Sequence, residues 1–426
     1  MDPEINYRIP QILRYMGNKR SILNRIIPII ESNIDEKKMF FDVFAGTNSV
    51  GYAIKTTNGG NIGVVTNDVQ AYSYVISKAL IENNAIHKIP LYEAQSDLMN
   101  NFKNNMNDIS KTWSDAFIKN HQYRTHLSDK EISFQQFIKK SITETPFCLF
   151  SFYFTNVYFS LEQCKEIDSL RFAIEQIKNP IKKNIYLICL LYAVSYGSST
   201  FGHFAQPRKV TEEVLKIREK SISELFFKKL SELSIKKNNK KNFCFNEDYK
   251  TLFTRKEFKK LKNKIGFVYV DPPYSTANYS RFYHILETLV KYDYPENDYK
   301  GLYREDRFKS NFCKSRKVEE EFRAVFEFVK DIEAGMVVSY INSGLGLLPK
   351  ERLVTLCEEY FGSKNVTTFP DIPHIHSTLG NRTKKHVKEV LILCRPAHHA
   401  VRCPRRIALP IQTCRHGISQ LALSAG

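Results

Sequence analysis

Hydrophobic residues along the first 84 positions follow two alternating spacings. Short apolar runs at 39–46 (MFFDVFAG) and 62–68 (IGVVTND) end in Gly, Asn or Asp, as strands that run into turns do. The segments around them carry their apolar residues on one helical face. These predicted helices are residues 19–33, 49–55 and 71–83. Strands that alternate with helices imply a parallel sheet with crossover connections.

The same alternation returns after residue 241. Two late apolar runs, 365–372 and 386–394, flank a polar loop and predict an antiparallel hairpin that closes the sheet. We therefore expect an α/β fold with a mostly parallel sheet. The other elements predicted here are strands at 242–248, 266–274 and 335–341 and helices at 281–292 and 318–332.

Between residues 85 and 240 the alternation is lost. This stretch is rich in Asn, Lys and aromatic residues and contains a loop with Gly and Ser at 195–209 (SYGSSTFGHFAQPRK). Its helical segments are 166–177, 183–194 and 212–233. We interpret 85–240 as a mainly helical domain that is inserted into an α/β domain formed by 1–84 and 241–395.

The composition changes abruptly near the C-terminus. No acidic residue follows Glu389 and no Lys follows Lys388, whereas Arg, Ala, Pro and Cys become frequent. We expect residues 396–426 to be a disordered extension, a frameshifted end or a cloning remnant. A functional basic tail is the alternative.

The chain is strongly basic. Its formal net charge of +18 and pI near 9.3 favour a polyanionic partner, because each neutralised phosphate releases condensed counterions. Charge alone leaves DNA, RNA, an anionic membrane surface and a merely solvated basic surface open.

Other signals indicate a soluble, cytoplasmic protein. No apolar run approaches the ~20 residues needed to cross a bilayer, and no basic segment followed by an apolar one opens the chain. Nine cysteines without a CxxC pair fit reduced thiols better than disulfides or a zinc site. His374 and His376 lack further ligands and are interpreted as a polar strand face, so we expect no metal.

A glycine-containing turn follows the first predicted strand. In FFDVFAGTNSVGY, residues 40–52, the turn leads into a helix start, which brings backbone N–H groups close to a ligand such as a nucleotide. Asp68 comes about 20 residues later, where doubly wound folds place an acid that binds ribose hydroxyls. GxGxxG is absent, so an adenosine without a pyrophosphate fits better than NAD.

A second strand end carries different chemistry, in FVYVDPPYSTANYS, residues 267–280. Prolines donate no hydrogen bond, but their carbonyl oxygens are held in fixed directions. The carboxylate of Asp271 and a rigid carbonyl therefore make two acceptors for one NH2 group, and Tyr274 offers a flat face for a heterocycle. The pattern indicates a site for the exocyclic amine of a nucleobase.

Three ordered motifs carry a family resemblance. RYMGNKRSIL (14–23), DVFAGTNSVGY (42–52) and DPPY (271–274) resemble the motifs of Dam-like, alpha-group DNA adenine-N6 methyltransferases, over about residues 8–394. The segment after the tetrad, YSTANYSRFYHILETL, is similar to that of modification enzymes of type II restriction systems. The resemblance implies a Rossmann-like, S-adenosylmethionine-dependent fold whose mostly parallel seven-stranded sheet ends in an antiparallel hairpin.

The resemblance also assigns residues. Asn48 departs from the family, which often has a second Gly there, but Asn tolerates left-handed backbone angles. Tyr15 and Phe44 could instead be core aromatics, and Asp248 a helix cap. The implied cofactor residues are Tyr15, Gly17 and Lys19 beside the methionine part of S-adenosylmethionine, Phe44, Ala45 and Gly46 in the turn, Asp68 at the ribose and Asp248 at the adenine; the implied catalytic residues are Asp271, Pro272, Pro273 and Tyr274.

The implied reaction methylates the amine of an adenine that is flipped out of double-stranded DNA and stacks on Tyr274. Related enzymes carry Asn at the first position of the tetrad for glutamine, guanine or RNA adenine and often Ser for cytosine N4, so Asp271 favours DNA adenine. A DNA-binding or specificity protein without activity is the alternative from another class.

Recognition of the DNA is expected in the inserted region. The loop 198–209 contains Gln206, Arg208 and Lys209, which we take as DNA-facing residues, with a simple helix connection as the alternative. The charged loop 296–317 is a second candidate clamp on the phosphates. We expect a monomer, possible pairing with a cognate restriction endonuclease and no membrane partner.

Overall fold

A computed structural model of the chain describes residues 7–112, 147–297, 302–342, 346–376 and 385–396. One mixed sheet organises this part of the protein, with strand order β3-β2-β1-β4-β5-β8-β6. The first five strands in this order are parallel, and β8 is antiparallel to β5. The strands are β1 (Met39–Asp42), β2 (Gly63–Asn67), β3 (Phe243–Phe245), β4 (Ile265–Val270), β5 (Gly335–Ile341), β6 (Val366–Thr368), β7 (Ile372–His376) and β8 (Lys385–Cys394).

The antiparallel end of the sheet contains a split strand. Val366 of β6 pairs with Cys394 of β8, and Ile372 of β7 pairs with Glu389 further along β8. The Phe369 N–H donates to the Leu391 carbonyl at 2.9 Å and joins the two pairings. Because β6 and β7 share one edge of β8, eight strands fill seven positions. The predicted seven-stranded sheet with a terminal hairpin is confirmed.

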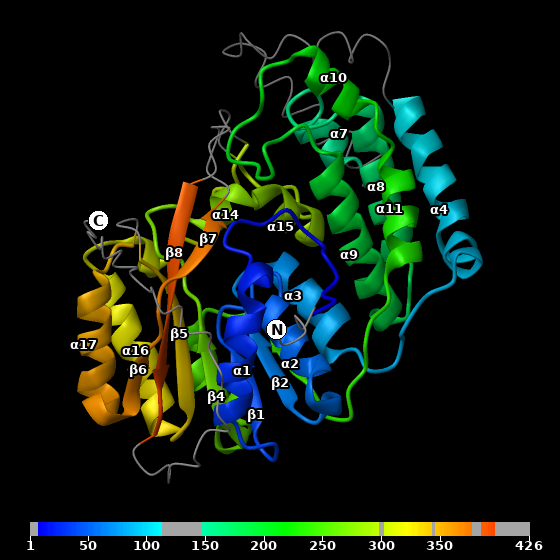
Figure 1. The fold of residues 1–426 in the computed structure, drawn as a ribbon. Helices are drawn as coiled ribbons and strands as arrows, with labels where there is room; N and C mark the ends of the chain where they lie inside the picture. The colour runs from blue at the N-terminus through cyan, green and yellow to red at the C-terminus, as the bar shows by residue number, and fades with distance from the viewer. Residues whose placement is uncertain (1–6, 113–146, 298–301, 343–345, 377–384, 397–426) are drawn as a thin grey trace, which may run out of the picture.

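Helices cover both faces of the sheet, because side chains alternate along each strand. Phe40 packs with the helices of one layer, whereas its neighbour Phe41 packs with those of the other. Figure 1 shows the two layers on opposite sides of the sheet. The first contains α1 (Leu23–Asn33), α2 (Ser49–Thr56), α3 (Ala71–Ser77), α14 (Tyr279–Phe282) and α15 (His284–Lys291); the second contains α12 (Tyr249–Thr254), α13 (Lys256–Lys259), α16 (Val318–Asp331) and α17 (Lys350–Phe361).

Several helix bounds differ from the predicted ones for local reasons. The predicted helix 212–233 is two helices, because Ser221 accepts a hydrogen bond from the Glu224 N–H and starts the second one. The predicted helix 281–292 is broken at Tyr283, and 71–83 ends in a π-helical turn, Lys78–Glu82. Helix α17 has no counterpart among the predicted elements.

The region 85–240 adds a helical layer beside α3 (Figure 1). Its central helix α9 is apolar on nearly all sides and packs against α8 and α11 as well as α3 and α15. These helices and the first layer of the sheet share one hydrophobic core. The described helices of the region 85–240 are α4 (Leu91–Thr112), α7 (Leu149–Tyr153), α8 (Leu161–Glu175), α9 (Pro180–Gly197), α10 (Glu212–Arg218) and α11 (Ile222–Glu232).

Two other sequence predictions concern the C-terminal segment and a pair of histidines. Apart from Pro396, the segment 396–426 lies outside the described residues. His374 and His376 belong to strand β7. Among the helices that are described, none combines the length and apolar character that a bilayer crossing requires.

Candidate active site

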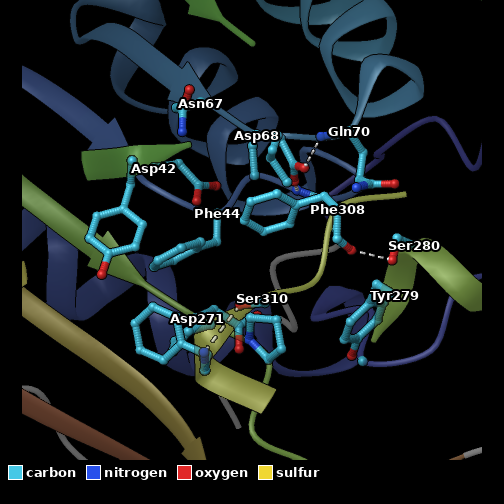
Figure 2. Close-up of a pocket in the computed structure, with 18 of the residues that line it drawn as sticks. Asp42, Phe44, Asn67, Asp68, Gln70, Asp271, Tyr279, Ser280, Phe308 and Ser310 are labelled. Atoms are coloured by element: carbon cyan, nitrogen blue, oxygen red, sulfur yellow. Dashed lines mark hydrogen bonds between the residues drawn. The ribbon is translucent and has the colours of Figure 1, made fainter. Parts of the chain in front are cut away.

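A pocket opens at the carboxyl ends of three neighbouring parallel strands. Asp42 ends β1, Asp68 follows β2 and Asp271 follows β4, and all three line the pocket (Figure 2). Ligand sites of doubly wound sheets lie at this edge. Eleven of the predicted site residues line the same pocket: Tyr15, Gly17, Lys19, Phe44, Ala45, Gly46, Asp68, Asp248, Asp271, Pro272 and Pro273.

Asp68 holds the glycine turn in place. Its two carboxylate oxygens accept hydrogen bonds from the Gly46 N–H at 2.8 Å and the Gln70 N–H at 2.9 Å; Figure 2 draws the second. The Ser73 hydroxyl donates to the Gly46 carbonyl at 2.7 Å. Burial raises the pKa of Asp68 to about 6, against the opposing effect of these hydrogen bonds. The acid that we predicted for a ribose therefore also fixes the turn.

The departure at Asn48 is accommodated by the backbone. Asn48 has φ 60°, in the left-handed region that we expected it to tolerate. Its side-chain amide donates to the Ser73 carbonyl at 3.3 Å and accepts from the Ser77 hydroxyl at 2.7 Å. The side chain thus ties the turn to α3, which a second Gly could not do.

The N-terminal motif docks on the helix that follows the DPPY tetrad. The Tyr15 ring stacks on Tyr283, with centroids 4.6 Å apart, and on Tyr279 at 5.4 Å. Gly17 has φ +72°, and a β-carbon there would lie 2.8 Å from the Tyr279 hydroxyl. Only glycine fits this position without strain. Tyr15 is therefore both a packed aromatic and a pocket residue.

Asp271 meets a buried cation. The Lys19 ammonium lies 2.9 Å from the Asp271 carboxylate and 3.2 Å from that of Glu389, which sequence reasoning missed. Burial raises the pKa of Asp271, Lys19 lowers it and Glu389 raises it, and the net result is upward, to about 7. The proposed acceptor for an amine is thus a carboxylate held beside a buried cation that it shares with a second carboxylate.

Two buried acceptors in the pocket have no partner among the described residues. They are one carboxylate oxygen of Asp42, which is 2% exposed, and the side-chain oxygen of Gln70, which is 7% exposed. Burial, followed by the charges of Asp271 and Asp68, raises the pKa of Asp42. Buried acceptors of this kind need donors, which a ligand with N–H and O–H groups would supply. The position of Asp42 at a strand end was the available sequence signal.

The wall opposite the strands comes from the charged loop. Phe308 and Lys309 line the pocket, and the Ser280 hydroxyl donates to the Phe308 carbonyl at 2.5 Å (Figure 2). The Ser310 N–H donates to the Asn278 side chain at 2.8 Å. The part of loop 296–317 that we expected on DNA phosphates therefore also forms a pocket wall, apart from residues 298–301, which lie outside the described chain.

Asp248 and Tyr274 depart in part from the simplest expectation. Asp248 lines the pocket and also caps α12, accepting from the Lys250 N–H at 3.0 Å. Tyr274 is 6% exposed, packs edge-on against Tyr340 at 6.3 Å and does not contribute to the pocket lining. The structure thus brings the acceptors of the tetrad to the pocket but not its aromatic ring.

The three predicted DNA-facing residues lie outside this pocket. Gln206 and Lys209 are exposed, and Arg208 pairs with Glu213 at 2.8 Å and lies over the Phe201 ring at 4.7 Å. Their loop is tied to the helix after the tetrad, because the Phe204 N–H donates to the Phe282 carbonyl at 2.7 Å.

This fold and this pocket together define a class. A parallel sheet that ends in an antiparallel strand, with acids at adjacent strand ends around a nucleotide-sized site, is that of a Rossmann-like methyltransferase. The family described as D12 class N6 adenine-specific DNA methyltransferase matches residues 15–340. The chain belongs to this family.

Similar proteins of known name come from several microorganisms. The chain is 30% identical to type II methyltransferase M.FokI of Planomicrobium okeanokoites, over 80% of this chain and 46% of that protein. It is 28% identical to modification methylase LlaI of Lactococcus lactis subsp. lactis, over 82% of this chain and 49% of that protein. It is 25% identical to type II methyltransferase M.NlaIII of Neisseria lactamica, over 78% of this chain and 84% of that protein. The chain thus spans about half the length of the first two.

Proposed function

We propose that this chain methylates the N6 amine of an adenine flipped out of double-stranded DNA and uses S-adenosylmethionine as the methyl donor. We further propose that it acts in the cytoplasm as the modification enzyme of a restriction system, as a monomer beside a cognate endonuclease. The observation that carries the proposal is the Asp271 carboxylate, which faces the same pocket as the glycine turn and the two unpartnered acceptors.

The residues present fit the proposed cofactor. Asp42 and Gln70 would accept hydrogen bonds from its amino or hydroxyl groups, and Asp68 has lone pairs left for the ribose. Phe44 and Asp248 line the side of the pocket proposed for the adenine. When it is bound, S-adenosylmethionine supplies a methyl group on a positively charged sulfur.

Asp271 and Pro272 would activate the amine. The adenine lone pair is delocalised into the ring, and acceptance of both amino hydrogens by the Asp271 carboxylate and the Pro272 carbonyl localises it on nitrogen. The same two acceptors stabilise the positive charge that develops there, and a proton leaves after attack through Asp271 or water. Pro273 adds no competing donor, because it has no N–H.

The DNA must be distorted for this chemistry, because N6 of a stacked, paired adenine is out of reach. Tyr274 is our proposed stacking partner, and its ring must then leave the contact with Tyr340. Gln206, Arg208 and Lys209 would contact the surrounding duplex, and the net charge of +18 supports binding to phosphates.

Transfer of a labelled methyl group to DNA tests the proposal. The purified chain should label adenine-containing duplexes, and sequencing of the product should place N6-methyladenine within one short sequence. Asp271→Ala should lower the rate by more than about a thousandfold while cofactor binding stays measurable. Label on cytosine N4 or on RNA would replace the proposed substrate, and DNA binding without transfer by the unaltered chain would support a specificity protein instead.

A further inference from the structure

The charge arrangement behind the catalytic carboxylate includes a residue outside the matched family region. Glu389 lies on β8, beyond residue 340, where the family match ends. It pairs with Ile341 of β5 on one side and with Ile372 of β7 on the other. Its side chain is 1% exposed and does not contribute to the pocket lining. A carboxylate buried this deeply needs charged or hydrogen-bonding partners.

Lys19 and Ser339 are partners of this kind. The Glu389 carboxylate lies 3.2 Å from the Lys19 ammonium and accepts a hydrogen bond from the Ser339 hydroxyl at 2.6 Å. Lys19, 5% exposed, also donates to the Gly17 carbonyl at 3.3 Å and lies 2.9 Å from Asp271. One buried ammonium is therefore shared by two carboxylates.

Sharing changes what Lys19 can do to Asp271. A lysine paired with Asp271 alone would neutralise it and weaken it as an acceptor for an amine. Because Glu389 also pairs with the ammonium, Lys19 neutralises Asp271 only in part. With both carboxylates ionised, Lys19, Asp271 and Glu389 together carry one net negative charge. A developing positive charge on a substrate nitrogen is stabilised by that excess charge.

We propose that Glu389 is a positioning residue for methyl transfer: through Lys19, it keeps the Asp271 carboxylate oriented and electron-rich without touching the substrate. This inference rests on the proposed function, since it deepens the role of Asp271 in the same site. It also gives a reason for a buried acid immediately before the apolar run Val390–Cys394.

Other charged and titratable groups face this cluster, and they set the background for any pH measurement. Asp42 approaches Asp271 from β1, Tyr269 lies on β4 itself, and Tyr274 and Tyr279 approach from the segment after β4. Burial raises the pKa of each of these three tyrosines. They therefore stay neutral near pH 7, and Lys19 and Glu389 are the charged groups that act most strongly on Asp271.

Glu389→Gln tests the proposal with little change of shape, because the amide can still accept from Ser339 and Lys19. Removal of the second negative charge lowers the pKa of Asp271 from about 7. The active form is the ionised carboxylate, so the acid limb of the kcat/KM profile should move to lower pH by about one unit. The plateau rate should fall about three- to tenfold, because a less basic carboxylate is a weaker acceptor.

Binding measurements separate this role from a structural one. Cofactor and DNA dissociation constants and the thermal midpoint of Glu389→Gln should stay close to those of the unaltered chain, and only the rate at saturation should fall. Glu358→Gln, an exposed acid on α17, is the matched control and should leave rate and profile unchanged. An unshifted acid limb with an unchanged rate in Glu389→Gln would overturn the inference.

A second variant, Lys19→Met, tests whether Glu389 acts on Asp271 through Lys19. In a Lys19→Met chain the two carboxylates lose their shared cation, and Glu389→Gln should no longer lower the rate. A drop of the same size as in the unaltered background would contradict action through Lys19. If Glu389→Gln fails to fold, Ser339→Ala should still shift the acid limb in the same direction, and no shift would count against the proposal. If the unaltered chain transfers no methyl group, the proposed function fails instead.

Discussion

Two parts of the site, named here the turn wall and the charged wall, are built in different ways. The turn wall joins Gly46 to Asp68, 22 residues later, through hydrogen bonds between a carboxylate and backbone N–H groups. The charged wall joins Lys19 to Asp271 and Glu389, which are 252 (271 − 19) and 370 (389 − 19) residues away along the chain. Contacts within one crossover unit can be recognised in a motif, whereas the pairing of Lys19 with the remote Glu389 appears only in the folded chain.

The walls also respond differently to loss of a partner. Backbone donors in the turn wall can be satisfied by water or a ligand when a side chain is removed. In the charged wall, removal of one ion leaves another buried and uncompensated, which is far more costly. We therefore expect changes in the turn wall to alter cofactor affinity, and changes in the charged wall to alter the chemical step or the stability.

The strongest test of this contrast is Asp68→Ala. Loss of two hydrogen bonds to an ionised carboxylate should raise the dissociation constant for S-adenosylmethionine about 10- to 100-fold. At saturating cofactor the single-turnover rate should stay within about threefold of the unaltered rate. Calorimetric titration and rapid-quench assays measure the two quantities. Asp331→Ala, an exposed acid at the end of α16, is the control, and an equally large fall in the saturated rate would remove the contrast.

A smaller effect, on the free energy of unfolding, should separate the cost of a left-handed backbone from the cost of a steric clash at glycine positions. Gly17 and Gly59 have similar φ values, +72° and +65°, but only at Gly17 would a β-carbon come within 3 Å of another group, the Tyr279 hydroxyl. Both Ala variants should pay about 1 kcal/mol for the left-handed backbone. Gly17→Ala should lose about 1–2 kcal/mol more in urea unfolding, because Tyr279 is stacked on Tyr15 and cannot yield freely. Equal losses would mean that the ring moves at no cost.

The smallest expected effect lies outside both walls. If Lys209 contacts a DNA phosphate, Lys209→Gln should reduce the slope of log K against log salt by about 0.9, measured by fluorescence anisotropy. Lys264, exposed just before β4 at the strand end away from the pocket, is the matched control and should leave the slope unchanged. Identical slopes in all three proteins would remove Lys209 from the DNA surface while leaving both walls as described.

Sequence patterns predicted the parts of the fold that repeat and the parts of the site that lie at motif positions. The crossover strands and the antiparallel end of the sheet follow from the spacing of apolar runs, and the pocket position of Asp68 and Asp271 follows from acids that come directly after such runs. These signals are local, and the physics that places them, side-chain alternation and parallel pairing, is the same in every such sheet.

The features that were missed lack a periodic signal. Glu389 is the single acid of β8 and follows Lys388, and nothing in the strand pattern says which remote cation it meets. Phe308 and Lys309 reach the pocket from an irregular loop held by Ser280. The burial of the Tyr274 ring depends on Tyr340, which lies on a strand 66 (340 − 274) residues later. Such contacts are set by tertiary packing and not by local preference.

Helix α9 limits how this protein can be recombined with its relatives. Because it packs at once on α8, α11, α3 and α15, a chimaera cut at residues 85 and 240 would exchange one side of a continuous core. The foreign helix would have to match the shapes left by α3 and α15. Substitutions confined to the exposed residues of the loop 198–209, such as Gln206 and Lys209, would keep that core intact, because Phe204 and Ala205 of the same loop belong to it. If this loop contacts DNA as proposed, altered specificity should be sought at its exposed positions, with α9 retained as part of the host.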